Sequence, residues 1–559
     1  MKLSELENVE IKVIEVPEPI QVPEEVKDKF TRDEWKVFGA LCNTNPALDC
    51  MENPIWIKNV MKCMKALDPE KKLESVWSDP TVKGLATNPS VKKWRAYYQS
   101  IKDAKAAFRK TPEYTTQNEA RKESRKPYMV ALVNGKEEPL QSFTLEPEGI
   151  YPGRPGSPDA GLWKEAVNLK EVVVNSKTKT PMLMQNDKLI SFDFKMEWDG
   201  KNHYAARYPV RVGVPGQKPV IEQYKKIMFA AGSSVKKEGQ LKKYSAGDLL
   251  LDHSKEIISA IEKDLKTKPD STAVALYVLF KKGIRIGDKK ATRNGTKGLL
   301  SIEWGKEVFE NPYGIKFDFL GKDSVHDDSL LEIKDKTIQD AIVKVWSKDV
   351  KLKTNKEDIK AYVKKVAPEV PYTPKLTRTM VAAVTMMDAL ETVIEKYKLT
   401  EASPEGLKKL AFNEANMAVA HQLNHQKGVS KAAKAKRDEK FKENKAKLKE
   451  REAKAEELTK KRKAKIKELK KAKKAGWEEK VAKLEEMITK SEFRTDLAKK
   501  NASFKESEAN FTGSTSKAAY IHPKIIADWC DRIKLPIEKV YSKSQVAQFE
   551  ELMSGGEDD

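Results

Sequence analysis

Apolar residues recur at helical spacing along most of the chain and alternate over shorter stretches. Helical spacing predicts helices for TRDEWKVFGALC, PIWIKNVMKCMKAL and VKKWRAYYQSIKDAKAAF, all within residues 29–130. Residues 1–28 are rich in proline and are expected to be extended. Glycine and proline crowd the segment 143–165, which predicts a loop, whereas the alternation in KEVVVNS and KLISFDFKMEW is typical of strands.

From about residue 216 the helical pattern becomes stronger. The segment 271–283, STAVALYVLFKKG, is predicted to be a buried helix, and LLSIEW and IKFDFLG are predicted to be two strands of a hairpin or meander. Long helices are expected at 376–397 and 407–428, the second with Gly428 as its C-terminal cap. HPKIIADWCDRIKL and SKSQVAQFEELM are predicted to be short amphipathic helices near the C-terminus.

Residues 431–494 are predicted to form an antiparallel pair of helices that projects into solvent. Between 431 and 475 there are 21 Lys and Arg against 8 Asp and Glu, so this helix is polar nearly all round and cannot bury a broad face. Gly476 separates it from WEEKVAKLEEMITKSEF, where apolar residues again recur at helical spacing. A disordered basic tract is the alternative, but strong helix formers and the well-placed glycine favour the hairpin.

The composition of the chain limits the classes of molecule that it is expected to bind. The chain has 559 residues, enough for three or four domains, and a net charge of +22. Such a charge favours a polyanion, with nucleic acid as the first candidate and an anionic membrane surface as the second, although a lysine-rich surface without a partner is also compatible. No run of 18 apolar residues exists, so we expect no transmembrane helix. The four cysteines form no CxxC pair, which argues against a zinc ribbon or a disulfide framework.

Common enzymatic motifs are absent or incomplete. No GxxxxGK[ST] loop for ATP is present, and GIRIGD lacks the preceding strand and third glycine of a dinucleotide-binding fingerprint. HQLNH places His421 and His425 one helical turn apart, which could hold zinc, but no third ligand is evident. We therefore expect neither a cofactor nor a metal.

Protic and basic residues fit another chemistry, the cleavage of a phosphodiester. Tyrosine can be the nucleophile, arginine can grip two non-bridging oxygens, and lysine or histidine can assist the leaving oxygen, with no metal in the set. Arg285 lies where it would cap the buried helix, Lys322 ends the strand in FDFLGKDS, and Arg378 opens a long helix. His425 lies near the end of the next helix, and Tyr520 follows the charged hairpin.

The order of these five residues, with the motifs around them, resembles eukaryotic-type DNA topoisomerase IB. FDFLGKDS looks like the family's lysine strand, FNEANMAVAHQLNHQK is similar to its histidine helix, and Lys375 to Arg378 fits its KxxR. SKAAYIHPKIIADWCDRIKLPIEKVYSKSQVAQF resembles its tyrosine-bearing C-terminal domain, and GIYPGRPGSPDAGLWK resembles the loop that enters its DNA clamp. The resemblance is clear from about 143 to 552 and faint over 1–142.

This resemblance implies a role for each candidate. Tyr520 would be the nucleophile, Arg285 and Arg378 would bind the scissile phosphate, His425 would donate a hydrogen bond to a non-bridging oxygen, and Lys322 would be the general acid for the 5′ oxygen. Further positions would lie against the DNA, namely Arg154, Asp323, Thr296, Lys297 and Lys375.

The resemblance also implies the fold class, which is α+β and mainly helical, with a bilobed DNA clamp. The expected partner is double-stranded DNA, bound with little sequence preference, and the expected state is a monomer. The protein is expected to be located with DNA inside the cell. That place would be the nucleus if the source is eukaryotic and otherwise a viral or prokaryotic cytoplasm. Five parts are expected: an N-terminal cap region (1–142), a mixed lobe with the clamp loop (143–215), a catalytic core (216–428), a charged hairpin linker (429–505) and a C-terminal domain (506–559).

Two departures from the family pattern stand out. A family motif similar to LRAGNEK reads IRIGDKK here, which puts a DNA contact at Asp288 in doubt. The residue before the tyrosine, usually the Asn that touches camptothecin-class inhibitors, is Ala519, which predicts weak camptothecin sensitivity. Two alternatives are a tyrosine recombinase, whose HxxR motif would replace Lys375 by His, and a non-enzymatic basic coiled-coil protein that binds DNA or RNA.

Overall fold

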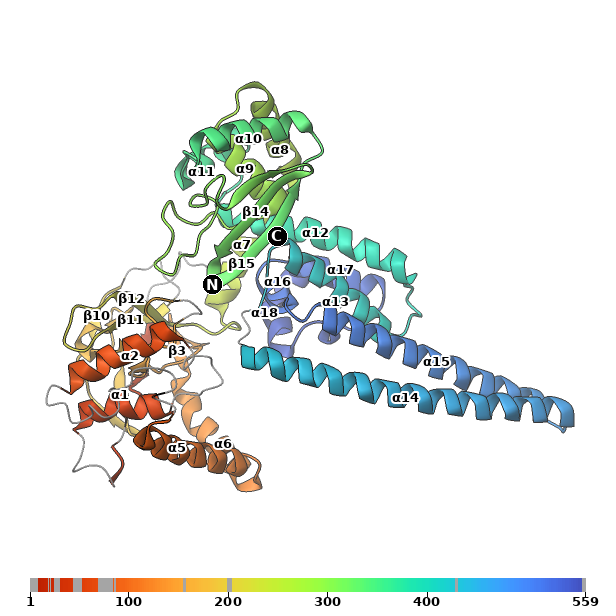
Figure 1. Ribbon diagram of the computed structural model, residues 1–559, viewed down its shortest axis with the longest axis horizontal. Helices are drawn as coiled ribbons and strands as arrows, with labels where there is room; N and C mark the ends of the chain where they lie inside the picture. Colours follow the sequence, from red (N-terminus) through yellow and green to blue (C-terminus); the bar gives the residue numbers. More distant parts are fainter. Residues whose placement is uncertain are drawn as a thin grey trace.

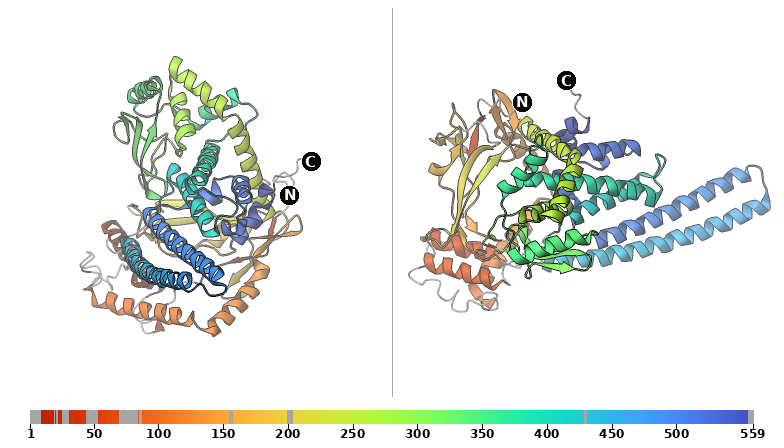
Figure 2. Two further views of the ribbon diagram at one scale, coloured as in Figure 1. Left: turned by 90° about the vertical axis from the view of Figure 1, so that its right-hand side faces the viewer. Right: turned by 90° about the horizontal axis from the view of Figure 1, so that it is seen from above.

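The computed structural model describes residues 9–18, 20, 22–24, 31–43, 53–68, 84, 87–153, 157–198, 204–427 and 431–554. Helices contain far more of the described residues than strands do, so the predicted mainly helical α+β class is confirmed. The elements before and after about residue 230 gather in two groups, and a long helical hairpin leaves the second group (Figures 1 and 2). None of the described helices combines the length and the apolar character needed to cross a membrane.

Helices of the N-terminal group pack on a hydrophobic core that includes Trp35, Trp56 and Trp94. Three of them begin with a cap residue followed by proline, and the cap side chain accepts a backbone N–H of the first turn. This arrangement satisfies donors that have no partner inside a helix, and proline suits the first helical position. The helices are α1 (Arg32–Asn43), α2 (Pro54–Leu67), α5 (Pro89–Phe108) and α6 (Pro112–Arg125).

Three sheets complete the N-terminal group. A six-stranded sheet has the order β10-β7-β11-β6-β5, with β12 paired to β11. Its strands are β5 (Gly149–Ile150), β6 (Trp163–Lys164), β7 (Val173–Val174), β10 (Lys195–Met196), β11 (Tyr204–Gly213) and β12 (Ile221–Met228). The small sheets join β1 (Val9–Ile11), β3 (Val130–Val133) and β4 (Lys136–Pro139), and β2 (Val13–Glu15), β8 (Met182–Gln185) and β9 (Lys188–Ile190).

The second group is a helical core with one antiparallel sheet, β13-β14-β15. Its hydrophobic core runs without a break into the C-terminal helices, because Trp346, Tyr244, Phe549 and Tyr520 belong to one cluster. The elements are α7 (Ser234–Asp252), α8 (Ser254–Thr267), α9 (Ser271–Lys282), β13 (Val308–Asn311), β14 (Gly314–Gly321), β15 (Val325–Glu332), α10 (Lys336–Asp349), α11 (Lys356–Val366), α12 (Pro374–Tyr397), α13 (Glu405–Gln422), α16 (Gly513–Ala519), α17 (Pro523–Arg532) and α18 (Lys543–Met553).

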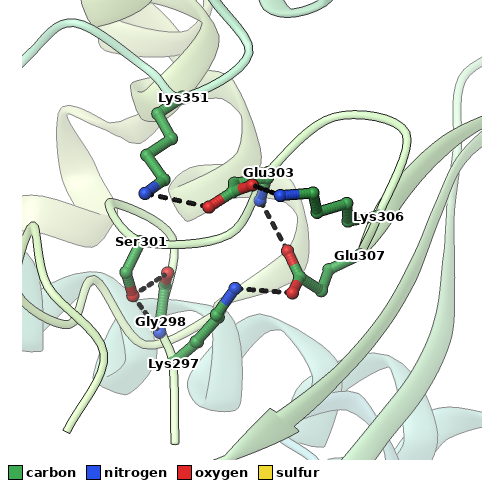
Figure 3. A network of polar contacts seen from close by, with 7 residues as sticks. All are labelled: Lys297, Gly298, Ser301, Glu303, Lys306, Glu307 and Lys351. Carbon is green, nitrogen blue, oxygen red and sulfur yellow. Dashed lines mark hydrogen bonds and ion pairs between the residues drawn. The ribbon is translucent and has the colours of Figure 1, made fainter. Parts of the chain in front are cut away.

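The strand predicted at 299–304 is wrong. Leu299, Leu300 and Ile302 are buried, but the segment forms hydrogen-bonded turns, in which the N–H groups of Ser301 and Ile302 donate to the carbonyl of Gly298. Ion pairs from Lys306 and Lys351 hold the carboxylate of Glu303 at the end of these turns (Figure 3). The predicted strand IKFDFLG pairs instead with β13 and β15.

The charged helical hairpin is confirmed as α14 (Lys431–Ala472) and α15 (Trp477–Ser507), which run side by side away from the core (Figures 1 and 2). Gly476, with φ of 74°, makes the turn. Buried Ile466, Val481 and Ile488 close the seam near this turn. Nearer the core, side chains of both helices line two solvent-open hollows of about 550 and 450 Å³.

Hydrogen bonds between described residues link the two groups at two places. At the start of α7, the N–H of Ser234 donates to Glu138 at 2.8 Å. Elsewhere, the loop after α9 reaches back to the N-terminal group, where Arg293 Nε donates to Asp159 Oδ1 at 2.9 Å and Ser157 Oγ donates to Asn294 Oδ1 at 3.1 Å.

Candidate active site

Arg378 lies at the centre of the candidate site, buried near the start of α12. Its guanidinium donates from Nη1 to the carbonyl of Gly283 and from Nη2 to that of Leu423 at 2.9 Å. These carbonyls stand at the C-terminal ends of α9 and α13, where helix dipoles favour a cation. Burial, together with the charge of Arg285, lowers the pKa of Arg378 to about 10, so the group stays protonated at neutral pH.

Gly283, and not Arg285 as predicted, caps α9. Its φ of 70° is left-handed, and a Cβ there would meet Leu423 Cδ2 at 2.9 Å. Only glycine combines that backbone with so close a neighbour. The chain then leads to Arg285, which is half-buried and donates from Nη1 to the phenol oxygen of Tyr520 at 3.3 Å.

His425 lies just after α13, not inside the helix predicted at 407–428. The helix ends at Gln422, because Asn424 adopts a left-handed φ of 52° and the N–H groups of Asn424 and His425 return to the carbonyls of His421 and Ala420. These bonds form a Schellman-type cap with asparagine in the place of glycine. The predicted cap, Gly428, lies outside the described residues.

The imidazole of His425 is buried and held from two sides. Its Nδ1 is 2.8 Å from Ser516 Oγ, and its Nε2 is 3.4 Å from Arg378 Nη2. Burial, and then the charges of Arg378 and Arg285, lower the pKa of His425 to about 3. The ring is therefore neutral at physiological pH, and its partners determine which nitrogen carries the proton.

Tyr520 ends the short helix α16 and is 6% exposed. Its ring centroid is 5.2 Å from that of His425 and 5.0 Å from Arg378 Cζ. Burial alone would raise the pKa of this phenol, but the positive charges of Arg378 and Arg285 and their hydrogen bonds outweigh it, so the pKa is lowered from its usual value. A lowered pKa makes the phenol a better nucleophile at neutral pH.

Lys322 reaches the same site from the end of β14. The turn is tight, because Asp323 and Ser324 both have a left-handed φ, of 67° and 57°. The exposed Lys322 shares a cavity of about 40 Å³ with Arg285, Arg378 and Lys297. Contacts thus connect four of the five residues picked out from the sequence, and the fifth, Lys322, shares a cavity with two of them, Arg285 and Arg378.

The other predicted DNA contacts occupy varied positions. Lys297 lines the cavity but pairs with Glu307 at 2.5 Å (Figure 3). Thr296 is held by Thr292, with 2.6 Å between the hydroxyl oxygens. Asp323 and Lys375 are exposed, at the Lys322 turn and in the first turn of α12, and Arg154 lies outside the described residues. Asp288 is exposed and pairs with Lys356 at 2.5 Å.

Sequence reasoning missed two buried polar residues of the site. Ser516, which bonds His425, lies in the TSK triplet before the tyrosine, and that triplet was the available signal. Asp327 lines the cavity beside Arg378 and accepts from Ser329 Oγ at 2.6 Å. A carboxylate at an inward position of the alternating strand β15 was the corresponding signal.

The two histidines of HQLNH face different partners. His421 Nε2 is 2.6 Å from Glu508, which directly follows α15, and its ring centroid lies 3.9 Å from that of Phe511, whereas His425 faces Arg378. Within the described residues, no three His, Cys, Asp or Glu side chains gather as metal ligands would.

Three parts of the chain match protein-family models. Residues 29–198 match the DNA-binding fragment of eukaryotic DNA topoisomerase I, residues 232–462 match its catalytic core, and residues 492–558 match the C-terminal topoisomerase domain. All five candidate residues fall within the second and third of these segments.

Similar proteins carry the corresponding names. The chain is 27% identical to "DNA topoisomerase 1 alpha" of Arabidopsis thaliana over 442 residues, which cover 76% of this chain and 45% of that protein. It is 25% identical to "DNA topoisomerase 1" of Caenorhabditis elegans, over 81% of this chain and 55% of that protein. It is 26% identical to the human "DNA topoisomerase I, mitochondrial", over 81% and 75%. The chain thus spans about half the length of the plant and nematode proteins.

Proposed function

Because the chain belongs to the eukaryotic DNA topoisomerase I family, we propose that it relaxes supercoiled DNA as a type IB topoisomerase. The observation that carries this proposal is the convergence of two arginines, a neutral histidine and a tyrosine of lowered pKa from four separate elements. Such a set places a nucleophile among donors for the oxygens of a phosphate.

In the proposed reaction, Tyr520 Oη attacks the scissile phosphorus, and the bond from phosphorus to the 5′ oxygen breaks. The phenol proton passes to solvent, and Lys322 gives a proton to the 5′ oxygen. Arg285 and Arg378 neutralise charge on the non-bridging oxygens, and His425 donates one further hydrogen bond there. The 3′-phosphotyrosyl link keeps the bond energy, so the 5′ hydroxyl can reseal the strand after rotation, with neither ATP nor a metal ion.

His425 can play this part only as one tautomer. A neutral ring donates from Nε2 when Nδ1 accepts a hydrogen bond, and Ser516 Oγ, at 2.8 Å, is placed to donate that bond. Arg378 Nη2 now lies 3.4 Å from Nε2. A phosphate that draws Arg378 away from the ring would leave Nε2–H free to reach an oxygen.

We propose that the two groups of elements enclose the duplex as a bilobed clamp. The contacts at Glu138 with Ser234 and at Asp159 with Arg293 support this arrangement, because they link the groups at two separate places. The basic helix α14 would follow the phosphates of the DNA beyond the site of cleavage. Since most such contacts go to phosphates, sequence preference would be weak, and one chain would suffice.

Relaxation of a negatively supercoiled plasmid tests the proposal directly. The wild-type chain should relax it in EDTA without ATP, and Tyr520→Phe should not, although it should still bind the plasmid. Tyr541→Phe is the matched control, because Tyr541 is a buried tyrosine of the same C-terminal module and lies outside the site. Equal activity in Tyr520→Phe and the wild type would reject Tyr520 as nucleophile, and inactivity of the wild type would reject the function.

A further inference from the structure

A lysine of α7 contacts the backbone directly before Tyr520. Lys243 Nζ donates to the carbonyl of Ala519 at 3.1 Å, across 276 residues of sequence. The same ammonium lies 3.8 Å from the ring centroid of Tyr244. The side chain is half-buried, and within the described part of the chain no carboxylate forms an ion pair with it. The carbonyl of Ala519 is therefore its main polar partner.

The carbonyl of Ala519 needs such a partner. The last four carbonyls of a helix have no N–H donor inside the helix. In α16 the carbonyl of Ser516 accepts from the N–H groups of Tyr520 and Ile521. The carbonyl of Ala519, at the helix end, accepts from Lys243 instead. A cation suits this position, because the C-terminal end of a helix carries partial negative charge.

Through α7, this contact connects the backbone next to Tyr520 with α12, the helix that carries Arg378. Gly247, one turn after Lys243, packs against Thr379 of α12, and a Cβ on Gly247 would meet Thr379 Cγ2 at 3.2 Å. Thr379 directly follows Arg378. The Ala519 carbonyl, Lys243, α7 and α12 thus form a short chain of contacts from the peptide of Tyr520 to its phosphate-binding partner.

We propose that Lys243 is a positioning residue, which holds the Ala519 carbonyl and so fixes the turn that aims Tyr520 at the scissile phosphate. The inference rests on the function proposed above. Lys243 acts here through the peptide, not by touching the DNA. A misplacement of reacting atoms by about 1 Å can slow a reaction by about a hundredfold, so the loss of this one bond should be visible in the rate of cleavage.

The ammonium group of Lys243 is partly shielded from solvent and lies near the positive charge of Lys375. Burial, and then the charge of Lys375, lower the pKa of Lys243 to about 7. A neutral amine still donates a hydrogen bond, so the contact with Ala519 survives deprotonation. Lys243→Met removes the donor, keeps the apolar stem and takes away a buried charge, so the variant should fold.

The test compares single-turnover cleavage with DNA binding in the full chain. The substrate is a duplex whose short downstream fragment leaves after cleavage, and covalent complex is trapped with detergent. Lys243→Met should form covalent complex at least tenfold more slowly than the wild type. Its dissociation constant for the same duplex, measured with Tyr520→Phe in both proteins, should change less than twofold. Lys243→Arg, which keeps a donor, should recover part of the rate.

Lys242→Met is the matched control, because the neighbouring Lys242 pairs with Glu238 on the surface. It should cleave at the wild-type rate. A wild-type rate in Lys243→Met would overturn the inference, and so would a slow rate accompanied by equally weakened binding, since that result would make Lys243 a DNA contact. An inactive wild type would instead reject the proposed function, and this inference with it. If Lys243→Met does not fold, Lys243→Arg and Lys243→Gln decide the matter by the same comparison.

Discussion

Asp159 and Arg293, which lie 134 residues apart in sequence, form a charge-assisted hydrogen bond between the two groups of elements. The bond is asymmetric, because the carboxylate side chain is 2% exposed and the guanidinium is 56% exposed. Asp159 is held in place by its surroundings, whereas Arg293 extends from a loop. If DNA passes between the two groups of elements, this bond must open for the DNA to enter.

The first prediction concerns this bond. Arg293→Ala removes the exposed partner and about 1 kcal/mol of attraction, so the protein should leave DNA about fivefold faster and relax a plasmid less processively. Covalent complex formed in one turnover should be unchanged. Processivity is read from the distribution of topoisomers at a low ratio of enzyme to plasmid. Arg293→Lys keeps the charge and should stay near wild type, and unchanged processivity in Arg293→Ala would show that the bond does not retain DNA.

A second prediction follows from the lowered pKa of His425. The pKa is about 3 in the folded protein and 6.5 for an ordinary histidine, so the unfolded chain binds a proton between these values and the folded chain does not. Stability should therefore fall as pH falls below about 6.5, by about 2 kcal/mol between pH 7 and pH 5. Denaturant unfolding of the wild type and of His425→Gln at both pH values measures this difference.

In His425→Gln, the loss of stability between pH 7 and pH 5 should be about 2 kcal/mol smaller than in the wild type. His326→Gln is the control, because His326 is exposed on β15 and pairs with Asp318 on the surface. Because the pKa of His425 is lowered to about 3, this ring should not change its charge near pH 6.5. The cleavage rate of the wild type should therefore show no step near pH 6.5 that is missing in His425→Gln. Such a step would show that the imidazole titrates in the active protein.

The third prediction concerns Ser516. Ser516→Ala leaves His425 Nδ1 without its partner in a buried site. The ring then loses the bond that sets its tautomer, and cleavage should slow about tenfold, which corresponds to about 1.4 kcal/mol. Ser514→Ala, on the exposed side of the same helix, is the control and should be neutral. Single-turnover cleavage rates decide between them, and equal rates would remove Ser516 from the mechanism.

The fourth prediction concerns inhibitors of the camptothecin class. The family's asparagine before the tyrosine is Ala519 here, and a methyl group cannot form the hydrogen bonds of an amide. Camptothecin should therefore trap little covalent complex with the wild type, and Ala519→Asn should increase trapping. The backbone contact with Lys243 uses the Ala519 carbonyl, so the substitution leaves that contact in place. Strong trapping by the wild type at low inhibitor concentration would contradict the prediction.

The pattern of apolar and polar residues was a reliable guide for the buried helix α9, for the long helix α12 and for the charged hairpin. It failed at 299–304, because a buried apolar run looks the same in a strand and in a tight turn that faces the core. It also placed the end of α13 too late, since Asn424 can take the left-handed conformation that the prediction reserved for Gly428.

The order of residues along the chain was enough to identify the candidate site residues. It could not identify the groups that those residues contact. The carbonyls of Gly283 and Leu423 that hold Arg378 carry no sequence signal at all, because every residue has a carbonyl. The link from Lys243 to Ala519 spans 276 residues and depends on how α7 packs. The reaction could be predicted from the types of side chain at the candidate positions. The orientation of those side chains depends on backbone carbonyls that only the fold brings near them.

The seam of the helical hairpin changes character along its length, and this has a mechanical consequence. Near Gly476 it is filled by Ile466, Val481 and Ile488, whereas nearer the core two hollows of about 550 and 450 Å³, open to solvent, lie along it. Close packing resists deformation, and empty volume does not. The hairpin should thus be stiffer near Gly476 than along the stretch that the hollows line. If the proposed function holds and the hairpin contacts turning DNA, a lateral force on it should bend this less tightly packed stretch first.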